Sequence, residues 1–255
     1  FVFDYDFLNG TCNTEEYLPR LASIAFRVEN VVLDLPPLTV ETRTFRLSDS
    51  ARSIYDAIQK GYVYEVETGR WVDQRCSYSV TMRLQQVTSG FLNLREGMTV
   101  PVDAGKAECL EDIIAEAGGE PVVVFTRFVH DLDTVQQIAE RLGLRYGEIS
   151  GRYKTALTNT AEMAEWCEVV GVQEVAGGAG IDLTRARIVV DYSPSWSLAN
   201  WDQKIARVLL PPQSKPVIVY RLVAEDTVDE EIHLALQARR EIIGKVWSGL
   251  ETVCP

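Results

Sequence analysis

The chain has 255 residues, of which 25 are Lys or Arg and 37 are Asp or Glu, so its formal net charge is −12 and its pI is near 4.7. This balance disfavours a general nucleic-acid coating protein, because affinity for phosphate backbones comes mainly from clustered Lys and Arg. With 46% hydrophobic and 24% charged residues the composition is that of a globular protein, not of a disordered, collagen-like or membrane one.

The cysteines and the absence of a long apolar run indicate the cellular compartment. The five cysteines are widely spaced and form no C-x-x-C pair, so neither a disulfide framework nor a zinc ribbon is predicted. No apolar run approaches the roughly 18 residues that a membrane span needs. We therefore expect a cytoplasmic protein without a membrane partner. Because the sequence opens at Phe1, we also expect a processed chain or part of a longer one.

Residues 1–105 predict a connecting segment that is mostly helical and carries a β-hairpin. In chain order we expect a half-exposed strand at Thr39–Leu47, a helix from the Ser48 cap to Lys60, a hairpin with strands Tyr62–Val66 and Trp71–Val72, a helix at Arg83–Leu94 and a linker at Met98–Gly105.

Residues 106–255 predict a second domain, in which buried strands alternate with amphipathic helices from residue 121 onward. Such alternation favours a parallel sheet covered by helices on both faces. The last helix follows a capping box at Thr227–Glu230. The expected strands are Pro121–Phe125, Leu144–Ile149, Val169–Val175, Arg187–Tyr192 and Pro216–Leu222, and the expected helices are Asp131–Leu142, Thr160–Cys167, Leu198–Val208 and Val228 to about Trp247.

The Gly-rich stretch Val175–Thr184 is the most informative motif. It follows a predicted strand, so its glycines lie where the backbone turns tightly and can approach a phosphate or a ribose. By itself such a stretch is more often a simple tight turn. Its context adds further motifs, in order: Val122–Phe128, Gly151, Gly177–Thr184, Trp196, Gln203 to Arg207, Gln213 and Thr227–Glu230.

This ordered set resembles the C-terminal RecA-like lobe of Swi/Snf-type superfamily-two DNA translocases, particularly the compact bacterial and phage kind. Upstream segments also fit: Leu18–Arg27 with Val32–Pro37 looks like the exit from a first lobe, and Leu84–Phe91 followed by Lys106 looks like the entry to the second. The resemblance covers nearly the whole chain. It implies an α/β fold with a RecA-like sheet, an ATP-dependent helicase or translocase activity, and DNA as a partner.

The resemblance also implies roles for single residues. Gln203 and Arg207 match the helix that reaches the γ-phosphate, with Arg207 as an arginine finger that meets phosphoryl charge. Gly178, Gly180 and Asp182 match the ATP-binding motif, whose carboxylate contacts the ribose. The positions that match the grip on the tracked DNA strand are Thr126, Arg127, Gly151, Arg152, Ala176, Gly177 and Trp196. For each arginine a solvated loop residue, and for Trp196 simple packing, is an equally open interpretation.

Two departures limit the resemblance. The family has a second Arg at the position of Leu210, so the catalytic competence of this chain is in doubt. No G-x-x-x-x-G-K-[ST] loop exists, since Gly105-Lys106 lacks both the first Gly and the Ser or Thr. ATP with Mg is therefore expected to be bound mainly by an N-terminal lobe outside this sequence, and this chain alone is predicted to be inactive. The acidic run Asp229–Glu231 opens a helix and predicts no metal site.

Other chemistries fit less well. The two histidines, His130 and His233, have no metal-ligand spacing, and no G-x-S-x-G elbow is present. A Rossmann-type enzyme is disfavoured because Gly177–Gly180 does not fit G-x-G-x-x-G. A degenerate, non-catalytic lobe that serves as a DNA- or protein-docking scaffold stays open as the alternative.

Charge is distributed unevenly along the chain. Residues 1–120 hold 11 basic and 19 acidic residues, whereas residues 121–220 hold 10 and 11. We therefore expect a monomer with a narrow basic track near the motifs, and weak, strongly salt-dependent DNA binding by this lobe alone. The basic residues close to the motifs are Arg127, Arg152, Lys154, Arg185, Arg187, Lys204 and Arg207.

Overall fold

The computed structural model describes eight stretches of the chain. They are residues 35–60, 62–65, 70–73, 77–94, 98–152, 167–174, 181–211 and 213–253, and the backbone alone is described for 62–65, 70–73, 77–79 and 243–253. The expected helix Thr160–Cys167 lies almost entirely outside these residues.

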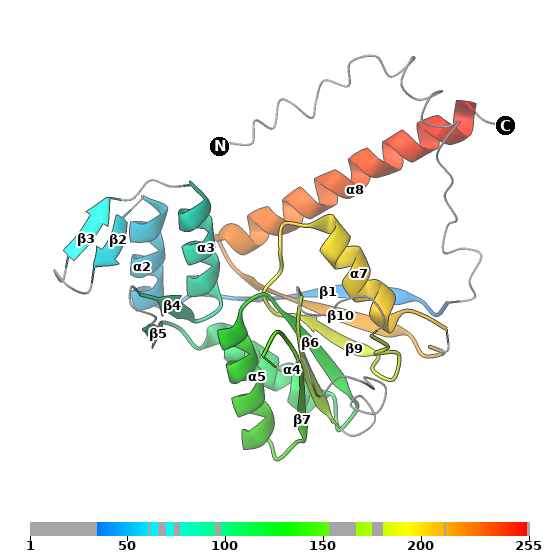
Figure 1. The fold of residues 1–255 in the computed structure, drawn as a ribbon, viewed down its shortest axis with the longest axis horizontal. Coiled ribbons are helices and arrows are strands. Elements are labelled where there is room, and N and C mark those ends of the chain that lie inside the picture. Colours follow the sequence, from blue (N-terminus) through cyan, green and yellow to red (C-terminus); the bar gives the residue numbers. More distant parts are fainter. Residues whose placement is uncertain are drawn as a thin grey trace.

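A six-stranded parallel sheet forms the centre of the fold (Figure 1). Its strand order is β1-β10-β9-β6-β8-β7, so strands that are distant in sequence are neighbours in the sheet. The predicted parallel sheet is confirmed, and the strand expected near residue 39 is its edge strand, paired with β10. The strands are β1 Leu38–Phe45, β6 Val122–Thr126, β7 Tyr146–Ile149, β8 Val169–Gln173, β9 Ile188–Asp191 and β10 Val217–Ala224.

Helices cover both faces of this sheet, as predicted. Helices α4 (Gly105–Glu116) and α5 (Val129–Arg141) pack on one face, and α7 (Leu198–Val208) packs on the other. Helix α7 has the predicted bounds, and it begins after Ser197, whose hydroxyl accepts a hydrogen bond from the Asn200 amide at 3.3 Å. Helix α4 was not anticipated from the sequence.

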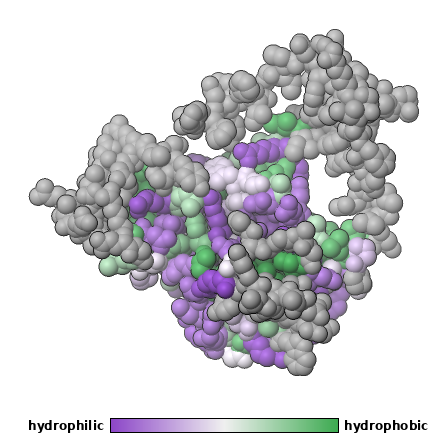
Figure 2. Space-filling model, viewed as in Figure 1, coloured by the Kyte–Doolittle hydropathy of each residue, from purple (hydrophilic) through white to green (hydrophobic). Residues whose placement is uncertain are grey.

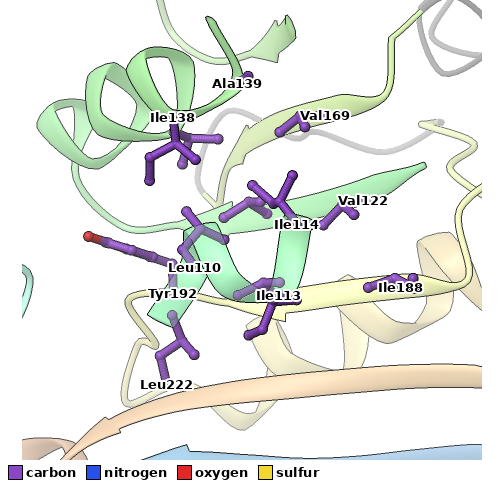
Figure 3. Close-up of a cluster of buried hydrophobic side chains, with 13 residues drawn as sticks. Leu110, Ile113, Ile114, Val122, Ile138, Ala139, Val169, Ile188, Tyr192 and Leu222 are labelled. Atoms are coloured by element: carbon purple, nitrogen blue, oxygen red, sulfur yellow. The ribbon is translucent and has the colours of Figure 1, made fainter. Parts of the chain in front are cut away.

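The alternation of side chains along β6 shows how the sheet builds two cores. Val122 and Val124 enter the core beneath α4 and α5, which Figure 3 shows in close-up. Val123 and Phe125 enter the opposite core, with Trp201 of α7. Because every residue of β6 is buried, the strand appears in the sequence as a continuous apolar run rather than as an alternating one.

A smaller group of elements precedes α4 and shares a third core with the start of α8. The predicted Ser48 cap of the first helix is confirmed, because its hydroxyl accepts a hydrogen bond from the Ala51 amide at 3.4 Å. The elements are α2 Asp49–Gln59, the hairpin β2 Tyr62–Glu65 with β3 Arg70–Asp73, α3 Ser77–Thr88, and the hairpin β4 Phe91–Asn93 with β5 Thr99–Pro101.

The prediction of a helix at Arg83–Leu94 is wrong in its second half. Helix α3 ends at Thr88, and the chain turns at Gly90 with φ +92°. A Cβ at Gly90 would lie 2.5 Å from the carbonyl oxygen of Asp103, and the Gly90 carbonyl accepts hydrogen bonds from the Val102 and Asp103 amides. The linker expected at Met98–Gly105 accordingly contains strand β5, which pairs with β4.

The C-terminal helix α8 (Val228–Val253) begins where predicted and extends six residues beyond the expected Trp247. Its cap differs from the predicted capping box. The Thr227 hydroxyl accepts from the Asp229 amide at 3.2 Å, but the Glu230 carboxylate accepts from the Asp226 amide, one residue before the expected one. Among the described residues no helix is both long and apolar enough to cross a membrane. Figure 2 shows hydrophobic residues only in small separate patches of the described surface in that view.

Candidate nucleotide and nucleic-acid sites

Four of the predicted DNA-contacting residues meet at the carboxyl edge of the sheet. Thr126 is the last residue of β6, and Arg127 follows it. Gly151 and Arg152 follow β7, and the Gly151 amide donates a hydrogen bond to the Gln173 side chain at the end of β8, at 3.2 Å. Because all these strands are parallel, residues separated by 25 positions in sequence lie along one edge.

The Arg127 side chain is held by helix α3. Its guanidinium donates to the Gln85 amide oxygen and contacts the Met82 sulfur at 3.0 Å. Its backbone amide donates to the Ser193 hydroxyl at 2.7 Å, while Gln85 donates in turn to the Pro194 carbonyl at 2.9 Å. Arg127 is therefore fixed at both backbone and side chain by neutral partners.

Arg152 is held by carboxylates instead. Its guanidinium donates to Glu148 at 2.7 Å and 3.0 Å and to Asp133 at 2.6 Å. These partners raise the pKa of Arg152 above its ordinary value, with the Glu148 hydrogen bond the largest cause. Two nearby carboxylates thus offset the charge that a phosphate contact would use.

Thr126 and Trp196, also predicted to contact DNA, are more buried than Arg152. Thr126 is fully buried, and its hydroxyl has no partner among the described residues. The Trp196 ring packs against the third core, its carbonyl accepts from Arg239, and its indole N–H likewise has no partner in the described part of the chain. Packing is therefore a demonstrated role of Trp196, and a DNA contact stays a prediction.

Of the predicted ATP-binding and catalytic residues that the structure describes, Asp182 and Arg207 lie at the opposite, amino edge. Asp182 is exposed, and its carboxylate accepts hydrogen bonds from the Thr184 amide and hydroxyl at 2.9 Å and 2.7 Å. The next residue, Leu183, donates its amide to the carbonyl of Arg207 at 3.0 Å. This bond joins the turn that holds Asp182 to the C-terminal end of α7.

Gln213 bonds both the turn that follows Asp182 and the chain that leaves α7. Its buried side-chain amide donates to the Thr184 carbonyl at 2.7 Å and to the Ala186 carbonyl at 3.1 Å, and its own backbone amide donates to the Leu210 carbonyl at 2.7 Å. The sequence placed Gln213 in the motif set without a role. The structure gives it a structural one, because it ties the turn after Asp182 to the chain that leaves α7.

Arg207 lies at this junction with its guanidinium uncommitted. It is half-buried, and within the described part of the chain the guanidinium has no hydrogen bond or ion pair. Burial alone lowers its pKa below the ordinary value of 12.5. Gln203, one turn earlier on α7, is exposed. A cation that is partly desolvated and unpaired is suited to meet an incoming anion.

Four predicted residues, Ala176, Gly177, Gly178 and Gly180, lie outside the described residues. Among those described, no group of three or more His, Cys, Asp or Glu side chains could hold a metal ion.

The comparisons with known proteins agree with this geometry. Residues 105–209 match the family model of the helicase conserved C-terminal domain. An uncharacterized ATP-dependent helicase of Mycoplasma genitalium is 26% identical over 227 residues, which are 86% of this chain and 22% of that protein. A DNA repair and recombination protein RAD54-like of Drosophila ananassae is 24% identical over 238 residues, covering 86% and 30%.

Two solved structures share the fold. The C-terminal part of the Fun30 ATPase domain matches with a TM-score of 0.66 at 15% identity, over 86% of this chain and 99% of that one. The Sulfolobus solfataricus SWI2/SNF2 ATPase core domain matches with a TM-score of 0.62 at 21% identity, over 86% and 46%.

Residues 105–209 thus match a helicase C-terminal domain, and the fold is similar to that of Snf2-type ATPase domains. This RecA-like fold is the one predicted. The chain spans less than a third of the length of the two curated relatives.

The described part of the chain contains a buried charge network that sequence reasoning missed. Lys204 was expected on an exposed basic track, and this is wrong, since only 3% of the residue is exposed. Its ammonium lies 2.5 Å from a Glu174 oxygen and 2.6 Å from an Asp191 oxygen. These carboxylates raise the pKa of Lys204 although burial lowers it. The predicted track is further reduced because Arg187 is paired with Glu120.

A second internal network joins the lobe to helix α3. Lys106 is buried and lies 2.7 Å from Asp229, which also accepts from the Thr88 hydroxyl at 2.9 Å. Neither Lys106 nor Asp229 is therefore free for phosphate or metal. Nearby, Asp131 is fully buried and accepts a hydrogen bond of 2.5 Å from Ser193. Burial is the largest cause that raises the pKa of Asp131 to about 7.

Proposed function

We propose that this chain is the second lobe of an ATP-dependent DNA translocase or helicase, with residues 106–255 as the lobe and 1–105 as the connecting segment. The observation that carries the proposal is Arg207, whose guanidinium has no partner among the described residues and whose backbone carbonyl is bonded to the Asp182 turn at one edge of a RecA-like sheet. The match of residues 105–209 to the helicase C-terminal domain supports it.

The amino edge has the chemistry that a nucleotide needs at a lobe interface. When bound, ATP with Mg supplies the phosphoryl group that is transferred to water. Arg207 donates hydrogen bonds toward phosphate oxygens and stabilises the negative charge that develops on them. The Asp182 carboxylate is exposed and accepts hydrogen bonds, which suits a ribose hydroxyl. Gln203 lies on the exposed surface of the same helix as Arg207.

A first lobe is required because no phosphate-binding loop precedes a helix here. The sequence has two Gly-Lys pairs. Gly105-Lys106 lies at the start of α4, where the lysine pairs with Asp229, and Gly244-Lys245 lies within α8, preceded by Arg239 instead of the first Gly of the motif and followed by Val246. We therefore expect negligible ATP hydrolysis by this chain alone. We also expect it to be a monomer that binds DNA weakly, through the carboxyl edge, where backbone amides and one neutrally held arginine are present.

The deciding experiment measures DNA-stimulated ATP hydrolysis by the complete gene product and by its Arg207→Ala variant. We expect the variant to lose about 10³-fold or more in kcat, as for other arginine fingers. Arg141→Ala is the matched control, because Arg141 is an exposed arginine at the end of α5 that pairs with Glu111 of α4. Hydrolysis at the full rate by the chain alone, or by Arg207→Ala, would contradict the proposal.

The alternative function is a non-catalytic docking scaffold derived from such a lobe. The observation that favours it is Leu210, 39% exposed, at the position where the family has a second arginine. A complete gene product that binds DNA but neither binds nor hydrolyses ATP would support the scaffold and exclude the motor.

A further inference from the structure

Nearly all arginines of this acidic chain that the structure describes at side-chain level have a partner. Arg221 has no hydrogen bond but stacks on the Trp201 ring, 4.1 Å from its centroid. Only Arg185 and Arg207 in the described set have neither a hydrogen bond, an ion pair nor a ring contact. The partnered ones are Arg43, Arg46, Arg52, Arg83, Arg127, Arg141, Arg145, Arg152, Arg187, Arg239 and Arg240.

These two free arginines lie at the same edge of the sheet, joined by the bonds described above. Arg185 stands between Thr184 and Ala186, whose carbonyls both accept from the Gln213 side chain. Two residues earlier, Leu183 is bonded to the Arg207 carbonyl. The backbone of Arg185 is therefore fixed on both sides, while its side chain is exposed.

Arg185 and Arg207 therefore place two guanidinium groups without a described partner on backbone segments that are bonded to each other at this edge. An anion with several charged oxygens, such as the phosphate chain of a nucleotide, can accept several hydrogen bonds from each guanidinium.

We propose that Arg185 is a second nucleotide-binding residue, which Gln213 positions next to Arg207 so that both contact the phosphates of ATP. This inference rests on the proposed function and extends it. It also explains why the lobe can have a leucine at position 210. The Gln213 amide bonds the Leu210 carbonyl, while its side chain bonds the carbonyls that flank Arg185, so one residue links the two positions.

Lys215 provides a matched control. It is also exposed, and its amide donates to the Gln213 side-chain oxygen at 3.1 Å, so it lies in the same neighbourhood. Its ammonium, however, acts on Glu120, the carboxylate that pairs with Arg187. Lys215→Ala and Arg185→Ala therefore each remove one positive charge from this edge, but only Arg185→Ala removes a guanidinium that has no partner among the described residues.

The test compares Arg185→Ala with Lys215→Ala in the complete gene product. Two quantities are measured: kcat/KM for ATP and the Kd of a non-hydrolysable ATP analogue. We expect Arg185→Ala to lose about 10- to 100-fold in kcat/KM and to weaken analogue binding, and Lys215→Ala to stay within about twofold of wild type. Unchanged melting temperatures show that both variants are folded, which is expected since both side chains are exposed.

Leu210→Arg completes the test as a double-mutant cycle. If Arg185 supplies the charge that is missing at 210, Leu210→Arg raises activity much more in the Arg185→Ala background than in wild type. Equal effects in both backgrounds would overturn the inference, as would an Arg185→Ala variant with wild-type affinity and turnover. If Arg207→Ala is also without effect, the proposed function itself has failed, and the two failures are thereby distinguished.

Discussion

The carboxyl and amino edges of the sheet differ in how their cations are paired. At the carboxyl edge Lys204 is buried between two carboxylates, and Arg152 lies between Glu148 and Asp133. At the amino edge Arg187 pairs with Glu120, but Arg185 and Arg207 have no partner among the described residues. The charges of Lys204 and Arg152 at the carboxyl edge are thus paired by carboxylates, with Arg127 held by neutral groups, whereas two guanidinium groups at the amino edge are open to an external anion.

This difference fits the different tasks that we propose for the two edges. A surface whose charges are already paired favours weak and reversible contacts, as a moving nucleic-acid strand requires. A surface with unpaired guanidinium groups favours a small, highly charged ligand. If this comparison holds, the buried ion pairs stabilise the carboxyl edge and Gln213 holds the turn at the amino edge in place.

The largest effect is expected from Lys204→Met, which removes the cation from a buried network. Glu174 and Asp191 would then face each other unpaired, and breaking a buried ion pair in this way costs about 3–5 kcal/mol of unfolding free energy. Urea unfolding of the chain measures this cost. Arg141→Ala, which breaks the exposed pair with Glu111, should cost about 1 kcal/mol or less. Equal costs for the two variants would show that the carboxyl edge does not depend on its buried network.

The next effect is a pH dependence that comes from Asp131. Its pKa is about 7 in the folded protein against an ordinary value of 3.8, so the folded state binds more protons than the unfolded state between these values. Stability should therefore fall as pH rises toward 7, by about 1.4 kcal/mol per unit, and level off above it. Ser193 and the Phe128 amide donate to this carboxylate, and Lys106 and Asp229 are the charged groups that act on it.

Asp131→Asn should abolish this dependence, which is measured as the difference in unfolding free energy between variant and wild type from pH 5 to 8. The difference is needed because His233 acts in the opposite sense. Burial lowers its pKa from 6.5 to about 4, so its contribution rises with pH over that range and cancels between the two proteins. A flat difference would mean that Asp131 is ionised at neutral pH.

A smaller loss is expected from Gln213→Ala at the amino edge. The variant removes the donor that two carbonyls share, those of Thr184 and Ala186, at a cost of about 1–3 kcal/mol. Gln136→Ala is the matched control, because Gln136 bonds only Glu140 on the exposed surface of α5. Urea unfolding distinguishes them, and a Gln213 variant as stable as the control would show that the turn holds its position without the clamp.

Local sequence signals account for most of the fold but not for these networks. The bounds of α7 follow from the Ser197 cap and from apolar residues at helical spacing, and the buried strands follow from β-branched runs. Helix α3 ends early because Gly90 lies against the carbonyl of Asp103, thirteen residues further on. A contact between residues that far apart in the chain cannot be recognised from the hydrophobic pattern of the helix alone.

The same reason explains why the burial and pairing of the site residues could not be predicted from the sequence. In the sequence, Lys204 has the position of a residue on the polar face of an amphipathic helix. Its burial depends on two carboxylates, 30 and 13 residues earlier, which the parallel strands β8 and β9 bring together. Arg185 likewise looks like any exposed loop arginine. Only the comparison with the other arginines, all of whose partners come from tertiary structure, distinguishes it.

The last and smallest prediction concerns DNA binding at the carboxyl edge, where Arg127 and Arg152 differ in their partners. Each cation that displaces a counterion adds about 0.9 to the slope of log affinity against log salt. Arg127 is bonded to the neutral Gln85 and Met82, so its charge stays available to a phosphate. Arg152 would have to give up two carboxylates to make the same contact.

Arg127→Ala in the isolated chain should therefore lower the salt slope for a DNA duplex by about one, while Arg152→Ala should change it by much less. Fluorescence anisotropy titrations at several salt concentrations measure both slopes. Equal slope changes would mean that the carboxylates around Arg152 give way to phosphate. The carboxyl edge would then be as open to anions as the amino edge, and the contrast between them would rest on the buried Lys204 network alone.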